Sequence, residues 1–133
     1  MFRSVQLRDY MLSNPVKIKP DANLFEAIEL ITNNKISGLC VVDDDNNLVG
    51  LLSELDCLRA ILSATYNESE VGAVREHMTS DNLMVTTSDE SIVELAQDML
   101  AHKHRRRPVV ENGKLVGQIT CRQLLNAVKG FRT

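Results

Sequence analysis

Two short motifs combine a hydroxyl side chain with a second polar side chain three residues later. Ser53 precedes Asp56 in LVGLLSELDCL, and Thr120 precedes Gln123 in LVGQITCRQLL, which starts 67 residues further along the chain. Both spacings fit a capping box, in which the two side chains accept hydrogen bonds from backbone N–H groups at the start of a helix. Gln serves this purpose well, so capping makes the second motif tolerable and leaves the Asp56 carboxylate open to a further role.

A run of basic side chains follows a predicted helix, at Lys103, His104, Arg105, Arg106 and Arg107. Cations at the C-terminal end of a helix are stabilised by its dipole by roughly 0.3–1 kcal/mol, and such runs often form a solvated face. This run is longer than capping requires, and no aromatic platform for nucleic-acid bases lies near it. We favour contacts with the phosphate of a small anionic ligand over helix-end and surface roles, and both over nucleic acid.

The chain lacks the residue sets that usually carry catalysis. No nucleophile–base pair, paired carboxylates, glycine-rich phosphate loop or metal-spaced Cys/His cluster is evident. The three cysteines, Cys40, Cys57 and Cys121, are odd in number and far apart. We therefore expect no enzymatic activity, no metal, no covalently bound cofactor, and free thiols in a cytoplasmic protein.

Length and composition are those of a globular chain. It has 133 residues, of which 44% are hydrophobic and 25% charged, and its formal net charge is −3. A dedicated nucleic-acid binder usually has a strongly basic balance, so nucleic acid is an unlikely partner. No stretch approaches the roughly 20 apolar residues that cross a bilayer, so we expect no membrane association.

The chain contains two similar halves. LRDYM (residues 7–11) matches VREHM (residues 74–78), ISGLCVV matches HRRRPVV, and LVG occurs in both halves. A period of about half the chain indicates a duplicated domain half, not a solenoid. We place the first repeat with its lead-in segment at residues 1–66 and the second with its lead-in at residues 67–133, together forming one module.

Both halves predict the same order of elements. Apolar residues follow helical spacing over residues 24–31 and 92–99, with Asp21 and Asp89 as the expected N-caps. Apolar runs follow, and the Asn112-Gly113 turn of the second half favours a type I′ hairpin. With brief strands at 16–18 and 84–86 and a helix after each LVG motif, the order is β-α-β-β-α twice, joined by a connection at residues 63–73.

Each half is too small to fold well alone, because about 60 residues bury too little surface. We therefore expect an α/β fold in which the two repeats pack sheet to sheet as a pseudo-twofold unit. Two related clefts would lie along its internal axis.

Together these motifs resemble a tandem cystathionine-β-synthase (CBS) domain pair, the Bateman module. The resemblance rests on the two lead-ins, the VVD and VVE strands and the phrase Gly-apolar-x-Ser/Thr-x-x-Asp, from residue 7 to about residue 129. The second copy departs from the phrase by ending in Gln123. In that family the clefts between the repeats commonly bind an adenosine-containing nucleotide and the module regulates another activity, although some members have no known ligand.

The first implied cleft has Ser53 and Asp56 at the ribose. An ionised carboxylate can accept hydrogen bonds from both ribose hydroxyls at once, whereas an amide offers one acceptor oxygen and a poorly matched NH₂ group. The resemblance implies that the base pocket of this cleft comes from the other repeat, at Met84, Arg105 and Arg106.

The second implied cleft uses residues around the base, a cation facing the phosphate and residues near the sugar: Val16, Ser37, Gly38, Leu39, Arg106, Thr120 and Gln123. The two clefts are unequal in opposite ways. The first has the carboxylate but Gly38 where a phosphate-binding cation often sits, and the second has the cation but Gln123 in place of the carboxylate. The sequence does not rank the two losses.

The resemblance implies a regulatory sensor of an adenosine nucleotide such as AMP, ADP or ATP, with energy or metabolite sensing as its role. No effector domain is evident in the chain, so we expect it to signal in trans to a separate effector protein. The alternative is a ligand-free scaffold for protein–protein interaction that acts through its helical faces. Because those faces commonly pair in the family, we also expect a homodimer.

Overall fold

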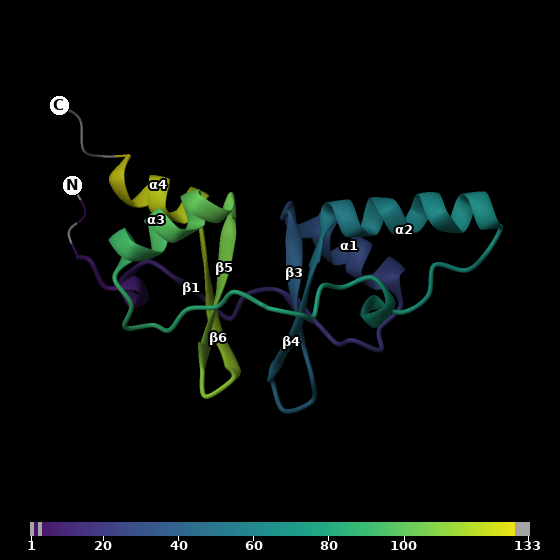
Figure 1. Cartoon of the computed structure of the whole chain (residues 1–133), viewed down its shortest axis with the longest axis horizontal. Coiled ribbons are helices and arrows are strands. Elements are labelled where there is room, and N and C mark those ends of the chain that lie inside the picture. The colour runs from purple at the N-terminus through teal and green to yellow at the C-terminus, as the bar shows by residue number, and fades with distance from the viewer. Residues whose placement is uncertain (1, 3, 130–133) are drawn as a thin grey trace. The chain divides into compact units, whose positions relative to one another are not determined.

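The computed structural model describes residues 2 and 4–129, which form two compact units (Figure 1). The central unit is Val16–Leu83, and the terminal unit combines Met1–Pro15 with Met84–Thr133. Each unit has a three-stranded sheet, and four α-helices are shared equally between them. The predicted α/β class is therefore confirmed, with two sheets and four helices.

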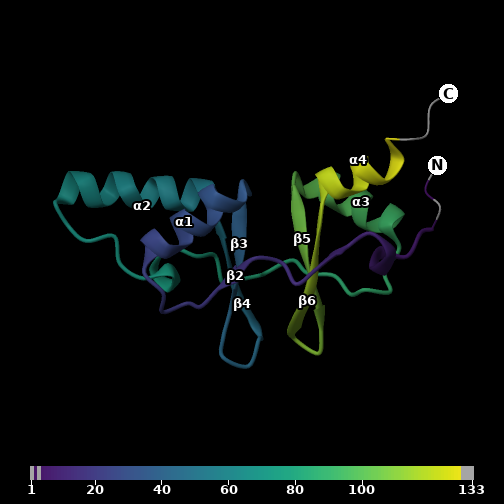
Figure 2. The same ribbon diagram turned by 180° about the vertical axis from the view of Figure 1, so that it is seen from behind.

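The central unit contains β2 (Lys17–Ile18), α1 (Leu24–Asn34), β3 (Gly38–Val42), β4 (Leu48–Ser53), α2 (Glu54–Asn67) and the 3₁₀ turn η2 (Val74–Glu76). β3 lies between β2, to which it is parallel, and β4, to which it is antiparallel. Both helices lie on the same side of the β3–β4 hairpin (Figure 2). Their apolar faces and the strands form one buried cluster, which includes Leu24, Ala27, Ile31, Leu39, Val41 and Leu52.

The terminal unit contains η1 (Leu7–Asp9), β1 (Leu12–Ser13), α3 (Ile92–His102), β5 (Arg106–Glu111), β6 (Lys114–Thr120) and α4 (Cys121–Val128). Its sheet order is β1-β6-β5, all antiparallel. The strand expected at residues 84–86 is reduced to a parallel bridge between Thr86 and Val109. Asn112 and Gly113 have φ values of 53° and 80°, so both have the positive φ that a type I′ turn requires.

Two boundaries differ from the sequence prediction. The N-caps of α1 and α3 are Asn23 and Ser91, whose side chains accept hydrogen bonds from Phe25 N and Val93 N. Asp21 and Asp89 are therefore wrong as N-caps, because an N-cap directly precedes the first helical residue. The second correction concerns α2, which continues to Asn67 and ends where Glu68 adopts a left-handed conformation. The connection that was expected from residue 63 therefore starts only at residue 68.

Each lead-in segment joins the sheet of the unit that holds the other repeat. Leu12 pairs with Gln118 of β6, and Thr79 forms a bridge with Leu51 of β4. The glycines of the two LVG motifs allow this close approach. A Cβ atom on Gly117 would lie 2.9 Å from the Leu12 carbonyl oxygen and 2.9 Å from Met11 Sδ. The division of the sequence into two repeats between residues 66 and 67 stays a proposal. The compact units follow other boundaries, because each of them contains the lead-in of one repeat and the rest of the other.

We predict that Gly117→Ala destabilises the fold by about 1–3 kcal/mol, because a backbone oxygen cannot rotate away from the added methyl group. Gly50→Ala is the matched variant. Its Cβ would lie 2.5 Å from Met78 Sδ, in a flexible side chain, and 3.1 Å from the Thr79 carbonyl oxygen, so we expect a smaller cost. Urea denaturation of both variants measures the difference. Wild-type stability for Gly117→Ala would contradict the prediction.

Candidate functional site

Ser53 and Asp56 form the predicted capping box at the start of α2. Ser53 Oγ accepts a hydrogen bond from Asp56 N at 3.1 Å, and Asp56 Oδ2 accepts one from Ser53 N at 2.9 Å. The other carboxylate oxygen, Oδ1, accepts a hydrogen bond from Arg59 Nη1 at 3.2 Å. The Asp56 side chain is 17% exposed, whereas that of Arg59 is 73% exposed. Capping therefore occupies one carboxylate oxygen, and within the described part of the chain the second contacts a solvent-exposed arginine that can exchange for another partner.

Thr120 and Gln123 form the equivalent box at the start of α4. Thr120 Oγ1 accepts from Gln123 N at 3.1 Å, and Gln123 Oε1 accepts from Thr120 N at 2.9 Å. The same Oε1 also accepts from Thr120 Oγ1 at 3.2 Å. The single amide oxygen therefore receives two hydrogen bonds within the box. The capping interpretation is confirmed for both motifs. Asp56 differs from Gln123 because its carboxylate is anionic and has a second oxygen that the cap does not use.

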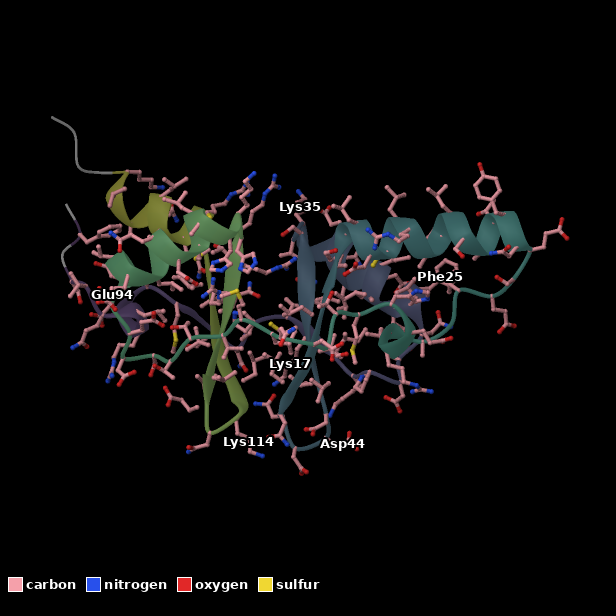
Figure 3. The ribbon with its side chains drawn as sticks, in the orientation of Figure 1. Lys17, Phe25, Lys35, Asp44, Glu94 and Lys114 are labelled. Atoms are coloured by element: carbon pink, nitrogen blue, oxygen red, sulfur yellow. The ribbon has the colours of Figure 1, made fainter. Side chains whose placement is uncertain are left out.

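In the central unit, the remaining candidate residues lie at the same end of the sheet as the Ser53–Asp56 box. Gly38 pairs with Ser53 across the hairpin, and the Ser37 carbonyl oxygen accepts from Glu54 N at 2.9 Å. Leu39 is buried, and Val16 is half-buried just before β2. Figure 3 shows Asp44 at the hairpin tip and Lys35 at the opposite end of β3. The candidate residues lie toward the Lys35 end.

The terminal unit repeats this arrangement with different side chains. Arg106 pairs with Thr120, and the Arg105 carbonyl oxygen accepts from Cys121 N, the first residue of α4, at 2.9 Å. Arg105 is exposed, and Arg106 is half-buried. Met84 is half-buried two residues before the Thr86 bridge. Each unit thus gathers its own candidate residues around a capped helix start.

The basic run divides into residues with different roles. Lys103 is the C-cap of α3, with a φ of 57°. For this residue the alternative of a role at the helix end is therefore correct. Arg107 is only 3% exposed, and its Nη1 lies 2.8 Å from Asp98 Oδ2. The sequence analysis favoured phosphate contacts for the basic run as a whole and gave Arg107 no role distinct from its neighbours. The sequence contained a signal for the burial of Arg107. In the first repeat, the positions that correspond to Asp98 and Arg107 are the apolar residues Leu30 and Leu39.

Cys57, which follows Asp56, is buried among the core residues of the central unit. Burial raises the pKa of its thiol, and the nearby Asp56 and Glu54 carboxylates raise it further. A raised pKa disfavours the reactive thiolate.

Within residues 2 and 4–129, the structure has no helix with the length and apolar character of a membrane span. The same residues contain no group of three or more His, Cys, Asp and Glu side chains arranged to hold a metal ion.

The comparisons with known proteins match both repeats. The CBS domain family matches residues 7–63 and 71–130. An uncharacterised Methanocaldococcus jannaschii protein, MJ1225, is 36% identical over 86% of this chain and 39% of its own length. The inosine-5′-monophosphate dehydrogenase of Aquifex aeolicus is 33% identical over 90% of this chain and 24% of its own. The chain thus spans well under half the length of these two relatives.

Among solved structures, that of CBSX2 in complex with AMP is 30% identical, with a TM-score of 0.83. The match covers 94% of this chain and 96% of CBSX2. Because the family match includes both repeats and the structural match nearly the whole chain, the protein belongs to the CBS domain family as a CBS domain pair.

Proposed function

We propose that this CBS domain pair is a regulatory module that binds an adenosine-containing nucleotide and signals in trans to a separate effector protein. The observation that carries the proposal is the second carboxylate oxygen of Asp56, which capping does not use. CBSX2, a similar CBS protein, was crystallised with AMP, which supports an adenosine ligand.

Asp56 is the group we propose for the ribose. Each carboxylate oxygen has two acceptor sites, so Oδ1 can accept both ribose hydroxyls while Oδ2 keeps the cap. Arg59 would have to leave Oδ1, at small cost because an exposed ion pair contributes little. Ser53, in the same box, is the second central-unit residue of this site.

Base contacts of this site are proposed for Met84, Arg105 and Arg106 of the terminal unit, and the basic run that contains both arginines is proposed for the phosphate. This unit contains ten Lys and Arg residues against six Asp and Glu, whereas the central unit contains five against twelve. The net positive charge of the terminal unit therefore favours binding of an anionic phosphate group there. The second set, Val16, Ser37, Gly38, Leu39, Arg106, Thr120 and Gln123, is proposed as a weaker site because Gln123 has no carboxylate.

The absence of enzymatic activity belongs to the proposal. The match with inosine-5′-monophosphate dehydrogenase covers 24% of that enzyme, so it supports a shared module and no transfer of dehydrogenase activity. A cytoplasmic location and a role in energy or metabolite sensing are also proposed.

A thermal-shift panel of AMP, ADP and ATP tests nucleotide binding directly. A ligand at one hundred times its Kd should stabilise the fold by about 2.7 kcal/mol, which appears as a raised melting temperature. Adenine-free ribose 5-phosphate is the control and should give a smaller shift. No shift with any of the three nucleotides would favour the scaffold alternative.

Substitution of Asp56 tests the ribose contact. Asp56→Asn should keep the cap and the ligand-free melting temperature, because the amide oxygen still accepts from Ser53 N. Loss of charge-assisted hydrogen bonds should nevertheless weaken AMP binding at least about tenfold in calorimetry. Gln123→Asp is the mirror variant and should strengthen or create the second site. Equal affinities and stoichiometries in all three proteins would leave capping as the only role of Asp56.

One face of α2 favours self-association, which is also part of the scaffold alternative. Leu55, Leu58, Leu62 and Tyr66 follow helical spacing, and each is between 53% and 85% exposed. We propose that this apolar stripe pairs with a second copy of the chain. Exposed apolar surface of this extent usually marks an interaction site.

Sedimentation at micromolar concentration should therefore find a dimer, and Leu58→Glu combined with Leu62→Glu should convert it to monomer, because paired stripes would bury the new charges. Leu100→Glu is the matched control, since Leu100 is 79% exposed but lies on α3. A monomeric wild type, or a dimer insensitive to the double substitution, would refute this interface.

A further inference from the structure

The terminal unit has polar side chains at positions where the central unit has an apolar cluster. Five central-unit members of that cluster are each replaced 68 residues later in the sequence. The replaced positions are Ile18, Ala22, Leu30, Ile36 and Leu39, and their counterparts are Thr86, Glu90, Asp98, His104 and Arg107. All five substitutions change an apolar residue to a polar one.

These polar side chains form a network centred on buried Arg107. Its Nη1 lies 2.8 Å from Asp98 Oδ2, and its Nη2 lies 3.2 Å from His104 Nδ1. Thr86 Oγ1 donates to Glu90, and burial raises the pKa of the Glu90 carboxyl group against the opposing charge of Arg107. Arg107 Nε is buried without a hydrogen-bond partner among residues 2 and 4–129.

Stability alone does not account for the network. Replacing a buried charged network with well-packed apolar side chains is often neutral or stabilising, and the central unit shows that this fold accepts apolar residues at all five positions. Stability therefore leaves room for a second role of this network.

Its position identifies that role. His104 and Arg107 directly flank Arg105 and Arg106 in the sequence, where the chain passes from the end of α3 into β5, and a side-chain contact joins His104 to Arg107 across them. The Arg105 carbonyl oxygen is bonded to Cys121 N beside the Thr120–Gln123 box. His104 and Arg107 are thus the immediate sequence neighbours of the two arginines that we propose for the phosphate.

We propose that Arg107, held by Asp98 and neutral His104, is a positioning residue that fixes Arg105 and Arg106 for the nucleotide phosphate. The inference rests on the proposed function, because it concerns regulation of the same site.

The proton on His104 decides whether the network is intact. A guanidinium group only donates hydrogen bonds, so Nδ1 of His104 must accept, and the ring must be neutral with its proton on Nε2. Protonation would place a donor against the guanidinium and break this contact. The other charged groups facing His104 are Asp98 and His102 of α3, the latter with its ring centroid 5.5 Å away. From α4, Cys121 Sγ approaches the His104 carbonyl oxygen at 3.7 Å.

Burial, followed by the charges of Arg107 and His102, lowers the pKa of His104 below its ordinary 6.5, against an opposing effect of Asp98. The contribution of a neutral histidine to stability is then complete above its unfolded pKa and is lost as the pH falls toward the folded value. The network should be intact at neutral pH and released in acid.

His104→Asn tests the inference, because the Asn Oδ1 can replace the accepting Nδ1 without titrating. Between pH 7.5 and 5.5, wild type should lose about tenfold more AMP affinity than His104→Asn. The AMP phosphate titrates identically in both experiments. The ratio of the affinity loss in wild type to that in His104→Asn therefore reports on His104 alone. His77→Asn is the matched control and should follow wild type, because His77 lies in the central unit, where its Nε2 contacts the Val71 carbonyl oxygen and no group of the network.

Two further measurements keep the test independent of the ligand and of folding. Amide signals of Arg105 and Arg106 in the ligand-free protein should shift across this pH range in wild type and stay fixed in His104→Asn. A variant with the five central-unit residues (Thr86→Ile, Glu90→Ala, Asp98→Leu, His104→Ile, Arg107→Leu) should keep its melting temperature yet bind AMP about tenfold more weakly.

Unshifted amide signals in wild type, parallel pH profiles for wild type and His104→Asn, or full AMP affinity in the fivefold variant would overturn the positioning role. If wild type binds no AMP at any pH, the proposed function fails, and the amide titration alone then decides whether the network positions the arginines.

Discussion

The close contact between each lead-in segment and the glycine of an LVG motif determines how this chain divides into units. The Leu12 carbonyl oxygen and Met11 occupy the space beside Gly117 that a side chain would fill, and Met78 and Thr79 do the same beside Gly50. Each short lead-in thereby extends the sheet of the unit that holds the other repeat. Neither compact unit is a continuous stretch of one repeat, so the two units are linked by the chain itself in two places.

On this shared backbone, the two repeats differ in the chemistry of equivalent side chains. The capping boxes at Ser53 and Thr120 have nearly the same hydrogen-bond lengths, so the backbone is indifferent to the exchange of Asp56 for Gln123. What differs is the number of anionic oxygens left after capping. Arg107 and Asp98 likewise replace two leucines of the first repeat, and the helix and the hairpin that carry them are kept as α3, β5 and β6. The fold tolerates both substitutions because strand pairing and helix capping use the backbone.

Much of the secondary structure follows from local sequence. Helical spacing predicts α1 and α3, the Asn112-Gly113 dipeptide predicts the hairpin turn, and the Ser/Thr-x-x-Asp/Gln spacing predicts both capping boxes. These features depend on residues within a few positions of one another, which a single sequence displays. The helix boundaries were less accurate. Asp21 and Asp89 carry good capping side chains, but the helices begin two residues later than these positions require, and Asn23 and Ser91 accept the capping hydrogen bonds from Phe25 N and Val93 N.

The sequence by itself determined the duplication, the element order and the difference between Asp56 and Gln123. Only the tertiary structure decided which unit each lead-in joins, because LRDYM and VREHM carry the same local pattern and their partners lie far away in the chain. It also separated Arg107 from Arg105 and Arg106. In the sequence these are three identical neighbours. Alternation along β5 places Arg106 and Arg107 on opposite faces of the strand, and Arg107 is buried beside Asp98, whereas Arg105 precedes the strand and stays exposed.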